Sequence, residues 1–431
     1  MAVDIVARGL AATETARQRR LRILNTLRAS IARADFAVPG MASQLPTIGA
    51  PSASSTIANG TTWQVATGGV PLHAGKYTFL GGSWQCPSAI FPNTEFYKSV
   101  TSRVGNGSDP LLNPRQGPGS RVRFTCAAPL LELYVQMSGP GVGGGFRLKV
   151  DGKLVQSGVI GNGGNGLLRY IPITWGDGSA SQRRDRNYEL EFASAGGFVG
   201  IRTSNLYRPY PWVQGDALRV LLHGDSMLAT INDPANIDSF PWGAQGALIG
   251  DLLGQADTWS SGVGGSGWMA PAIHDRSWFN ERVETDVISN SPDVIIEMGG
   301  GNDAAINPPQ PVIQGLIEAW LGRVIAARPD TVIFMTGPLI GSNASAAHHT
   351  IHAAKQAAAA RFARNTAFID TLGDPWVSGT GRDGSPAGDG NRDWVTGNDG
   401  AHPTCEGHLY LAGRVVRAVA RAIPALIAAQ A

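Results

Sequence analysis

Four short segments, far apart in the chain, carry residue types that together could transfer an acyl group to a serine. They are Gly224–Ser226, Gly262–Gly267, Gly300–Asp303 and Asp399–His402. The hydroxyl of Ser226 becomes a good nucleophile only beside a base, and His402 is a candidate for that base. Asp399 lies three residues before His402. This spacing lets its carboxylate reach the other imidazole nitrogen, fix the tautomer and stabilise the imidazolium.

The tetrahedral intermediate of acyl transfer also needs hydrogen-bond donors aimed at its oxyanion. Three donors are candidates: the backbone N–H of Ser226, the backbone N–H of a glycine in the second segment, and the side-chain amide of Asn302. Gly265 and Gly264 both fit the second donor, because the run of glycines leaves the register open.

In this order, the four segments resemble the four sequence blocks of the SGNH, or GDSL-type, esterase and lipase superfamily. The resemblance covers roughly residues 217–425, about half of the chain. It implies a catalytic triad of Ser226, His402 and Asp399. It also implies an oxyanion hole of Ser226, Gly265 and Asn302, with Gly264 as the nearest alternative to Gly265. Such a site requires neither a metal nor an organic cofactor.

The stretches around the segments predict a doubly wound α/β domain. Three apolar runs are typical of buried parallel strands: Arg219–His223, Val294–Met298 and Val332–Thr336. Three further stretches predict helices: Gln310–Arg328, Ala344–Arg364 and Glu406–Ala429. Ser226 and Asn302 follow two of the strands, and open α/β sheets place their ligand crevices at such loops.

The α/β-hydrolase fold is a second scaffold for a serine nucleophile. Its nucleophile elbow has the pattern G-x-S-x-G. Gly224 fits this pattern, but Leu228 stands where the second glycine is expected. The acid of that fold usually lies well upstream of its histidine, whereas Asp399 and His402 are nearly adjacent. We therefore favour the SGNH arrangement.

Other polar and aromatic residues near the segments have structural interpretations. His348, His349 and His352 lie in an alanine-rich helical stretch, and no histidine or cysteine cluster has zinc spacing. We therefore favour a solvated helix face over a metal site. Four further residues are interpreted as packing, turn or supporting residues: His223, His408, Asp225 and Asp303. Trp268 fits the border of the cleft and the core equally well.

Residues 62–212 predict an all-β domain. Short strands separated by glycine turns are expected at Arg121–Cys126, Leu130–Met137, Phe146–Val150, Leu154–Val159, Leu167–Ile173, Tyr188–Phe192 and Phe198–Arg202. Their regular spacing indicates a β-sandwich of the jelly-roll type. Cys86 and Cys126 lie in this domain, and a disulfide and two buried thiols are equally compatible with the sequence. For the aromatic residues Trp63, Trp84 and Tyr97, core packing is favoured over stacking on sugars.

Residues 1–38 form a separate helical segment, and residues 39–61, rich in Pro, Ser and Gly, are expected to be a linker. An apolar stripe runs through Leu10, Leu24, Leu27 and Ile31. Arg17 and Arg20 lie in the same seam and weaken a coiled-coil interpretation. The stripe is too thin to form a core alone, so we expect it to bury itself against another chain, in a homo-oligomer or a larger particle. Arginines interrupt the segment, which therefore does not resemble a signal peptide.

Composition narrows the function classes further. The 431 residues carry a net charge of +2, so nothing points to a nucleic-acid partner. No stretch of about twenty apolar residues occurs, so we expect no membrane span. The counts of 56 Gly and 27 Pro, with only 16% charged residues, indicate loop-rich β structure beside the α/β domain.

These expectations describe a serine esterase whose hydrolase domain, residues 213–431, follows a β-sandwich. This arrangement resembles two-domain carbohydrate esterases and also SGNH-bearing tail or spike proteins of bacteriophages, which favours an extracellular or virion location. The favoured substrate is a short acyl group, such as acetyl, on a polysaccharide, because a β-sandwich partner suits glycan binding. Two alternatives stay open: a glycan-adhesion or structural protein with a degenerate SGNH fold, and an acyltransferase.

Overall fold

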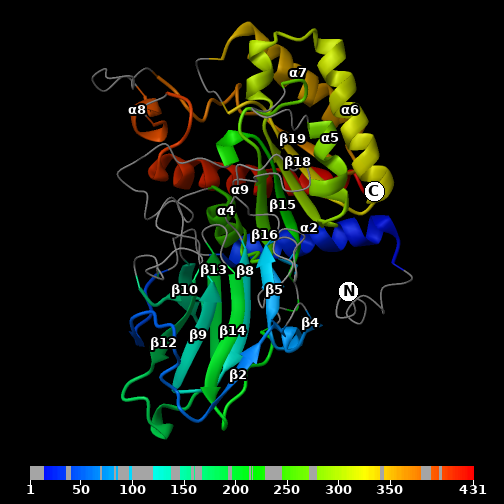
Figure 1. The fold of residues 1–431 in the computed structure, drawn as a ribbon. Coiled ribbons are helices and arrows are strands. Elements are labelled where there is room, and N and C mark those ends of the chain that lie inside the picture. The colour runs from blue at the N-terminus through cyan, green and yellow to red at the C-terminus, as the bar shows by residue number, and fades with distance from the viewer. Residues whose placement is uncertain are drawn as a thin grey trace.

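The computed structural model describes residues 14–34, 40–67, 70–81, 84–85, 97–99, 120–136, 146–156, 160, 167–192, 197–212, 215, 217–228, 245–270, 279–339, 344–379, 390–397 and 400–431. Within them, a β-sandwich forms one end of the molecule and an α/β domain forms the other (Figure 1). Helix α2, Ala16–Arg33, packs into the α/β domain, although the sandwich separates the two in sequence.

A five-stranded parallel sheet forms the centre of the α/β domain, with strand order β16-β15-β17-β18-β19. The strands are β15 Val220–Gly224, β16 Thr258–Gly262, β17 Val294–Met298, β18 Val332–Thr336 and β19 Thr366–Ile369. The three predicted strands coincide with β15, β17 and β18 to within one residue. The doubly wound α/β fold is confirmed.

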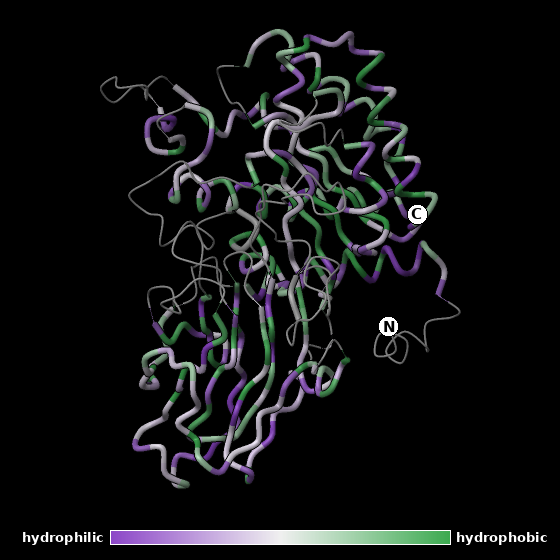
Figure 2. The backbone as a smooth tube through the Cα atoms, viewed as in Figure 1, coloured by the Kyte–Doolittle hydropathy of each residue, from purple (hydrophilic) through white to green (hydrophobic). Residues whose placement is uncertain are grey.

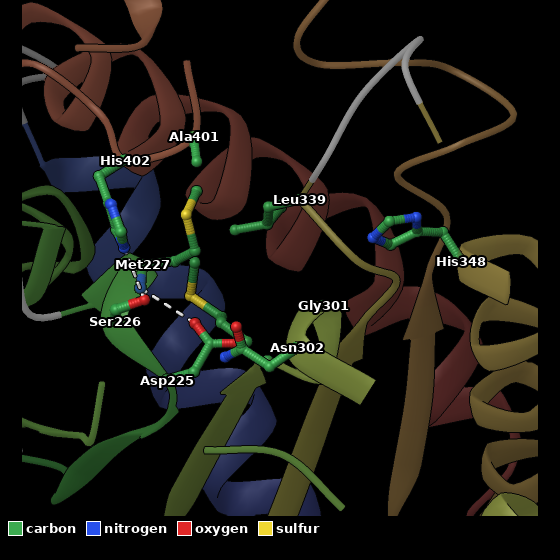
Figure 3. A pocket seen from close by; sticks show the side chains of 11 residues that line it. Asp225, Ser226, Met227, Gly301, Asn302, Leu339, His348, Ala401 and His402 are labelled. Atoms are coloured by element: carbon green, nitrogen blue, oxygen red, sulfur yellow. Dashed lines mark hydrogen bonds between the residues drawn. The ribbon is translucent and has the colours of Figure 1, made fainter. Parts of the chain in front are cut away.

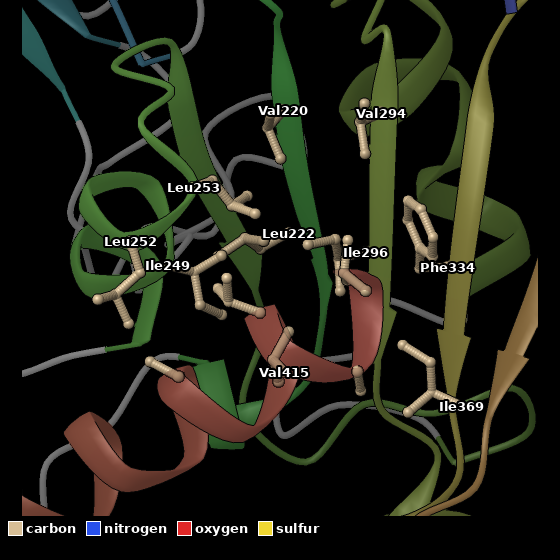
Figure 4. Packing of buried hydrophobic residues seen from close by; sticks show 14 of the residues in the cluster. Val220, Leu222, Ile249, Leu252, Leu253, Val294, Ile296, Phe334, Ile369 and Val415 are labelled. Atoms are coloured by element: carbon tan, nitrogen blue, oxygen red, sulfur yellow. The ribbon is translucent and has the colours of Figure 1, made fainter. Parts of the chain in front are cut away.

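Helices cover both faces of this sheet. Helices α2, α4 (Gln245–Leu253) and α9 (Cys405–Ala428) pack on one face, together with Leu222 and Ile296 of the strands (Figure 4). The opposite face carries α5 (Phe279–Arg282), the π-helix η6 (Val283–Ile288), α6 (Gln310–Ala327) and α7 (Ala346–Arg361). Leu221 and Ile295 point into this second core. Burial on both faces explains why these strands are continuous apolar runs.

Two antiparallel sheets form the β-sandwich. The first has the order β1 (Thr47–Ile48), β12 (Leu168–Thr174), β9 (Leu130–Gln136), β14 (Gly197–Ser204), β7 (Tyr97–Ser99) and β6 (Trp84–Gln85), with β2 (Gly60–Gln64) also paired to β14. The second has the order β11 (Lys153–Leu154), β10 (Phe146–Val150), β13 (Arg186–Phe192), β8 (Arg121–Cys126) and β5 (Thr78–Leu80). A hairpin of β3 (Ala66–Thr67) and β4 (Val70–Pro71) stands apart.

One apolar core fills the space between the two sheets, so the expected β-sandwich is confirmed. Trp63 and Trp84 pack against this core, whereas the side chain of Tyr97 lies outside the described residues. Cys126 is a free, buried thiol, and burial raises its pKa to about 11. Its proposed partner Cys86 also lies outside the described residues. Of the predicted strand Leu154–Val159, Leu154 pairs in β11, and residues 157–159 lie outside the described residues.

The segment expected to be a linker, residues 39–61, is instead fastened to the sandwich. Strand β1 pairs with β12, and Ser52 forms a bridge with Tyr170. The buried carboxylate of Glu132 accepts hydrogen bonds from the backbone N–H and the hydroxyl of Thr56, both at 2.7 Å. A Pro- and Gly-rich composition therefore predicted irregular backbone here, but not its attachment to a sheet edge.

Helix α2 corrects another expectation, namely that its apolar stripe packs against another chain. A capping box between Thr15 and Gln18 begins the helix. Leu24, Leu27 and Ile31 are buried in the core that α4 and α9 share with the sheet. Arg20 Nε donates to Gln430 Oε1 at 2.8 Å, so an arginine placed in the seam by the heptad pattern bonds to the end of the chain. Leu10 lies outside the described residues.

A buried ionic cluster joins the two domains. Three cations of the sandwich, Arg121, Arg147 and Lys149, contact the carboxylate of Asp251 on α4 at 3.0–3.1 Å. They also surround Glu191: although burial alone would raise its pKa, these cations hold it well below its usual range. Arg121 Nη1 further donates to the Ala256 carbonyl at 3.1 Å. The helices within the described ranges include none that is long and apolar enough to cross a membrane.

Candidate active site

Ser226 stands at the carboxyl end of β15, which lies between β16 and β17 in the sheet. It begins the short 3-10 helix η4, Ser226–Leu228. The turn into η4 requires glycine at position 224, because a Cβ there would lie 2.3 Å from the carbonyl oxygen of Met298 on β17. Glycine thus lets the end of β15 approach β17 closely and places Ser226 at the sheet edge.

His402 comes from the segment just before α9, 176 residues further along the chain. Its Nε2 lies 2.8 Å from Ser226 Oγ (Figure 3). The loop that carries it is closed by a hydrogen bond from the Gly397 N–H to the His402 carbonyl at 2.7 Å, and Thr404 caps α9. The predicted pair of nucleophile and base is therefore within hydrogen-bonding distance. Asp399 lies outside the described residues.

Asn302 lies in η7, Gly301–Ala305, which follows β17. Its side-chain amide donates to the Ser266 carbonyl at 3.0 Å and so ties the third segment to the second. Gly265 occupies the turn between Val263 and Ser266 with φ of 74°, a left-handed conformation that suits the third position of a type II turn.

A pocket of about 160 Å³ opens at this edge of the sheet. The residues that line it are Asp225, Ser226, Met227, Met298, Gly299, Gly301, Asn302, Leu339, His348, Ala401 and His402. The structure thus brings Ser226, Asn302 and His402 to one pocket. Neither Gly265 nor Gly264 is among the described residues that line it.

Two aspartates hold the loops around the pocket. Asp303 is fully buried, and its carboxylate accepts from the N–H groups of Trp268, Met269 and Ala270 at 2.7–2.9 Å. Asp225 accepts from the Met227 N–H at 3.0 Å, and burial raises its pKa to about 6. Both roles agree with the supporting functions expected for them.

Trp268, which the sequence placed equally well at the cleft or in the core, belongs to the core. Its side chain is 0% exposed and packs edge-to-face against Phe279 and Trp320. His223 is buried in the same cluster and stacks on Trp320 with the ring centroids 5.5 Å apart.

Arg282 is a buried residue of this site that the sequence did not reveal. Its guanidinium donates to the carbonyls of Gly224 and Ser261, each at 3.0 Å, and forms an ion pair with Asp286 at 3.1 Å. It therefore holds the ends of β15 and β16 together directly behind the nucleophile. Arg282 and Asp286 have i,i+4 spacing, and each directly precedes an apolar residue, Val283 or Val287; this is the signal that could have indicated a buried pair.

A second buried ion pair lies beneath the loop after β17. Lys355 Nζ is 2.7 Å from Glu297 Oε2 and donates to the Gly299 carbonyl at 2.7 Å, with both side chains fully buried. Burial raises the pKa of Glu297 to about 7, although Lys355 counteracts this. The pair anchors the backbone that leads to Asn302.

The three histidines of α7 do not share one solvated face, as the alanine-rich pattern had suggested. His349 is exposed, but His348 lines the pocket and His352 contacts Asp370 at 3.3 Å. Position on the helix explains the difference: His348 lies in the first turn of α7, and that turn faces the pocket. In the described parts of the chain, no three histidine, cysteine or acidic side chains gather as a metal site would require.

Comparison with known families agrees with this geometry. Residues 222–409 match the model of the GDSL-like Lipase/Acylhydrolase family. This part of the chain is similar to that family. The GDSL-like domain makes the protein an ester-cleaving hydrolase, and the four segments described above all lie within or border it.

Solved structures with a similar fold span both domains. One is an active-site mutant of a family two carbohydrate esterase from Clostridium thermocellum, with 12% identity, a TM-score of 0.53, and coverage of 79% of this chain and 96% of that one. Another is the salicylyl-acyltransferase SsfX3 from a tetracycline biosynthetic pathway, with 13% identity, a TM-score of 0.53, and coverage of 81% and 97%. At these identities the similarity concerns the fold alone. No curated protein sequence matches the chain.

Proposed function

We propose that the protein is a serine esterase that removes short acyl groups, most favourably acetyl, from a carbohydrate. The observation that carries the proposal is the 2.8 Å distance between Ser226 Oγ and His402 Nε2 in a pocket that Asn302 also lines. A hydroxyl, a base and an amide donor at one pocket are the parts needed for an acyl-enzyme route.

In the proposed reaction, Ser226 Oγ attacks the ester carbonyl while His402 Nε2 takes the hydroxyl proton. The backbone N–H of Ser226 and the amide of Asn302 stabilise the oxyanion, with the backbone N–H of Gly265 as the third predicted donor. When the carbon–oxygen bond to the alcohol breaks, His402 gives its proton to the leaving oxygen. Water, deprotonated by His402, then releases the acid from Ser226. Asp399 orients His402 in this scheme.

The size of the pocket supports a short acyl group. At about 160 Å³ it is smaller than the ~300–1,000 Å³ of pockets for drug-sized ligands. An ester group with a short alkyl chain fits this volume better than a fatty acyl chain.

Two observations support a carbohydrate as the alcohol part: the sandwich beside the hydrolase domain and the fold shared with a family two carbohydrate esterase. The fold shared with a salicylyl-acyltransferase favours one alternative, transfer of the acyl group from Ser226 to an alcohol instead of water. Attachment to a phage tail stays a prediction.

Four measurements test the proposal. Turnover of p-nitrophenyl acetate should be abolished in Ser226→Ala, and a serine-directed phosphonate should label Ser226 in the wild type; wild-type turnover in the variant would refute the nucleophile. Acetate release from a panel of acetylated plant and bacterial polysaccharides then identifies the substrate class. A sugar acceptor added to the first assay should yield no acylated sugar if water is the true acceptor.

A further inference from the structure

The pocket extends from Ser226 in one direction, away from His402. In Figure 3, His402 and His348 stand on opposite sides of it, with Asn302 and Leu339 between them. His402 comes from the loop before α9, whereas His348 comes from the first turn of α7 on the other face of the sheet. Because His348 lies on the opposite side of the pocket from His402, it does not act as a second base for Ser226.

The stereochemistry of ester cleavage indicates which side of the pocket receives the leaving alcohol and which side receives the acyl chain. The leaving oxygen must lie within hydrogen-bonding reach of His402 Nε2, because that nitrogen returns the proton to it. The oxyanion points to its donors, among them Asn302. The acyl chain is the remaining substituent of the tetrahedral carbon, so it points away from His402, toward Leu339 and His348.

The position of His348 is fixed by the start of α7. Its Nδ1 accepts a hydrogen bond from the Ser345 N–H at 3.1 Å and lies 2.8 Å from Ser345 Oγ. A ring nitrogen that accepts from a backbone N–H carries no proton, so the ring proton of the neutral form is on Nε2. Burial, followed by the nearby His349, lowers the pKa of His348, although a hydrogen bond to the Gly301 backbone raises it.

At the side of the pocket away from His402, Leu339 contributes an aliphatic side chain, and His348 contributes a ring whose lowered pKa favours the neutral form. Such a lining accepts a small alkyl group without the desolvation of a charge. Leu339 is itself packed against the core of α9 and the sheet, which limits its movement.

We infer that Leu339 and His348 form the far wall of an acyl pocket and set the length of acyl chain that the enzyme accepts. This inference rests on the proposed esterase function, and it deepens that function by naming the residues that select the acyl group.

The experiment compares kcat/KM for p-nitrophenyl acetate, butyrate and hexanoate. A methylene in an apolar pocket is worth about 10–200-fold in kcat/KM. His348→Ala should therefore raise the ratio of butyrate to acetate by at least about tenfold, and Leu339→Phe should lower it. His349→Ala is the matched control, because His349 is the next residue of the same helix and is exposed. Its chain-length profile should equal that of the wild type.

The outcomes separate this inference from the proposed function. Activity that survives Ser226→Ala on every ester refutes the proposed function itself. Activity that requires Ser226, but has the same chain-length profile in His348→Ala, Leu339→Phe and wild type, overturns the acyl pocket. A His348→Ala change confined to selectivity between different alcohols, at constant acetyl, also overturns it, because the wall then contacts the leaving group. If His348→Ala does not fold, the two Leu339 variants decide the question. Leu339→Phe should lower the ratio of butyrate to acetate kcat/KM, and Leu339→Ala should raise it.

Discussion

The side-chain amide of Asn302 donates a hydrogen bond to the carbonyl of Ser266 at 3.0 Å, and this contact joins two loops that 36 residues separate in the chain. An amide carries two N–H bonds, so one can hold the loop while the other faces the pocket that Asn302 lines. Orientation of the donor before substrate binds is what makes an oxyanion hole effective.

Replacement of Asn302 by alanine should therefore lower kcat by on the order of 10²–10³ with little change in KM, since the lost donor acts mainly in the transition state. Steady-state kinetics on p-nitrophenyl acetate measures this effect. Asn307→Gly is a suitable control, because Asn307 is exposed in the same loop and has a φ of 50° that glycine tolerates. A change in KM alone would make Asn302 a binding residue.

The buried carboxyl of Asp225 should make stability depend on pH. Its folded pKa of about 6 lies above its usual value of 3.8, and burial is the main cause. The folded state therefore binds more protons than the unfolded state between these values, and stability falls as pH rises through this window. Asp225→Asn removes the titration and keeps an oxygen for the Met227 N–H. Between about pH 4 and 6, the unfolding free energy of Asp225→Asn should increase relative to that of the wild type by on the order of 2–3 kcal/mol. Above about pH 6 the difference between the two proteins should stay constant.

Denaturant titrations at several pH values test this expectation. Asp151→Asn is the control, because Asp151 is an exposed turn residue at positive φ, where asparagine is tolerated. A difference between Asp225→Asn and wild type that does not change with pH would contradict the assigned cause.

Asp251 should matter more for stability than its partial exposure suggests. Asp251→Asn removes one of the carboxylates that three buried cations share, while Glu191 still contacts all three. Complete loss of one partner of a buried ion pair costs about 3–5 kcal/mol, so we expect a cost above about 1 kcal/mol that does not exceed this range. Guanidinium unfolding gives the free energy. Asp374→Asn is matched in chemistry but removes only the ion pair to Arg414, in which the Asp374 side chain is 74% exposed, so its cost should stay below about 1 kcal/mol. Equal costs for both variants would refute the role of the cluster.

Leu27 of α2 should behave as a core residue of the hydrolase domain. It is 0% exposed, so Leu27→Ala should cost about 2–5 kcal/mol, whereas Leu206→Ala, at a position 86% exposed, should cost almost nothing. Unfolding at two protein concentrations separates this result from the earlier expectation. If α2 packed against another chain, the midpoint of the wild type would rise with protein concentration.

The elements that could be predicted from the sequence are those whose own residue pattern identifies them without knowledge of their tertiary contacts. Strands β15, β17 and β18 are continuous apolar runs, because helices cover both sides of each, and the segments after them are short and distinctive. Strand β16 escaped prediction, since Ser260 and Ser261 interrupt its apolar pattern although both are buried. Its Ser261 hydroxyl bonds to Asp286, a contact that depends on the tertiary fold.

The residues missed at the site share this dependence on tertiary contacts. The amphipathic stripe of α2 was visible in the sequence, but the residues of α4 and α9 that share a core with it lie far away in the chain. His348 lies in an alanine-rich helix without a marked apolar face, so only the placement of the first turn of α7 reveals its contact with the pocket. The role of Arg282 likewise depends on its hydrogen bond to the Gly224 carbonyl, 58 residues away in the chain.

The contact between Arg20 and Gln430 spans 410 residues, so it can form only after most of this sequence has been synthesised. Helix α2 leaves the ribosome before α9, against which it packs and which follows all the other helices described. The sandwich between them can fold as soon as it emerges, since domains generally fold as units during synthesis. The core that buries Leu24 and Leu27 is therefore complete only after α9 has been synthesised, and we expect a chaperone that shields these side chains until then to raise the yield of active protein.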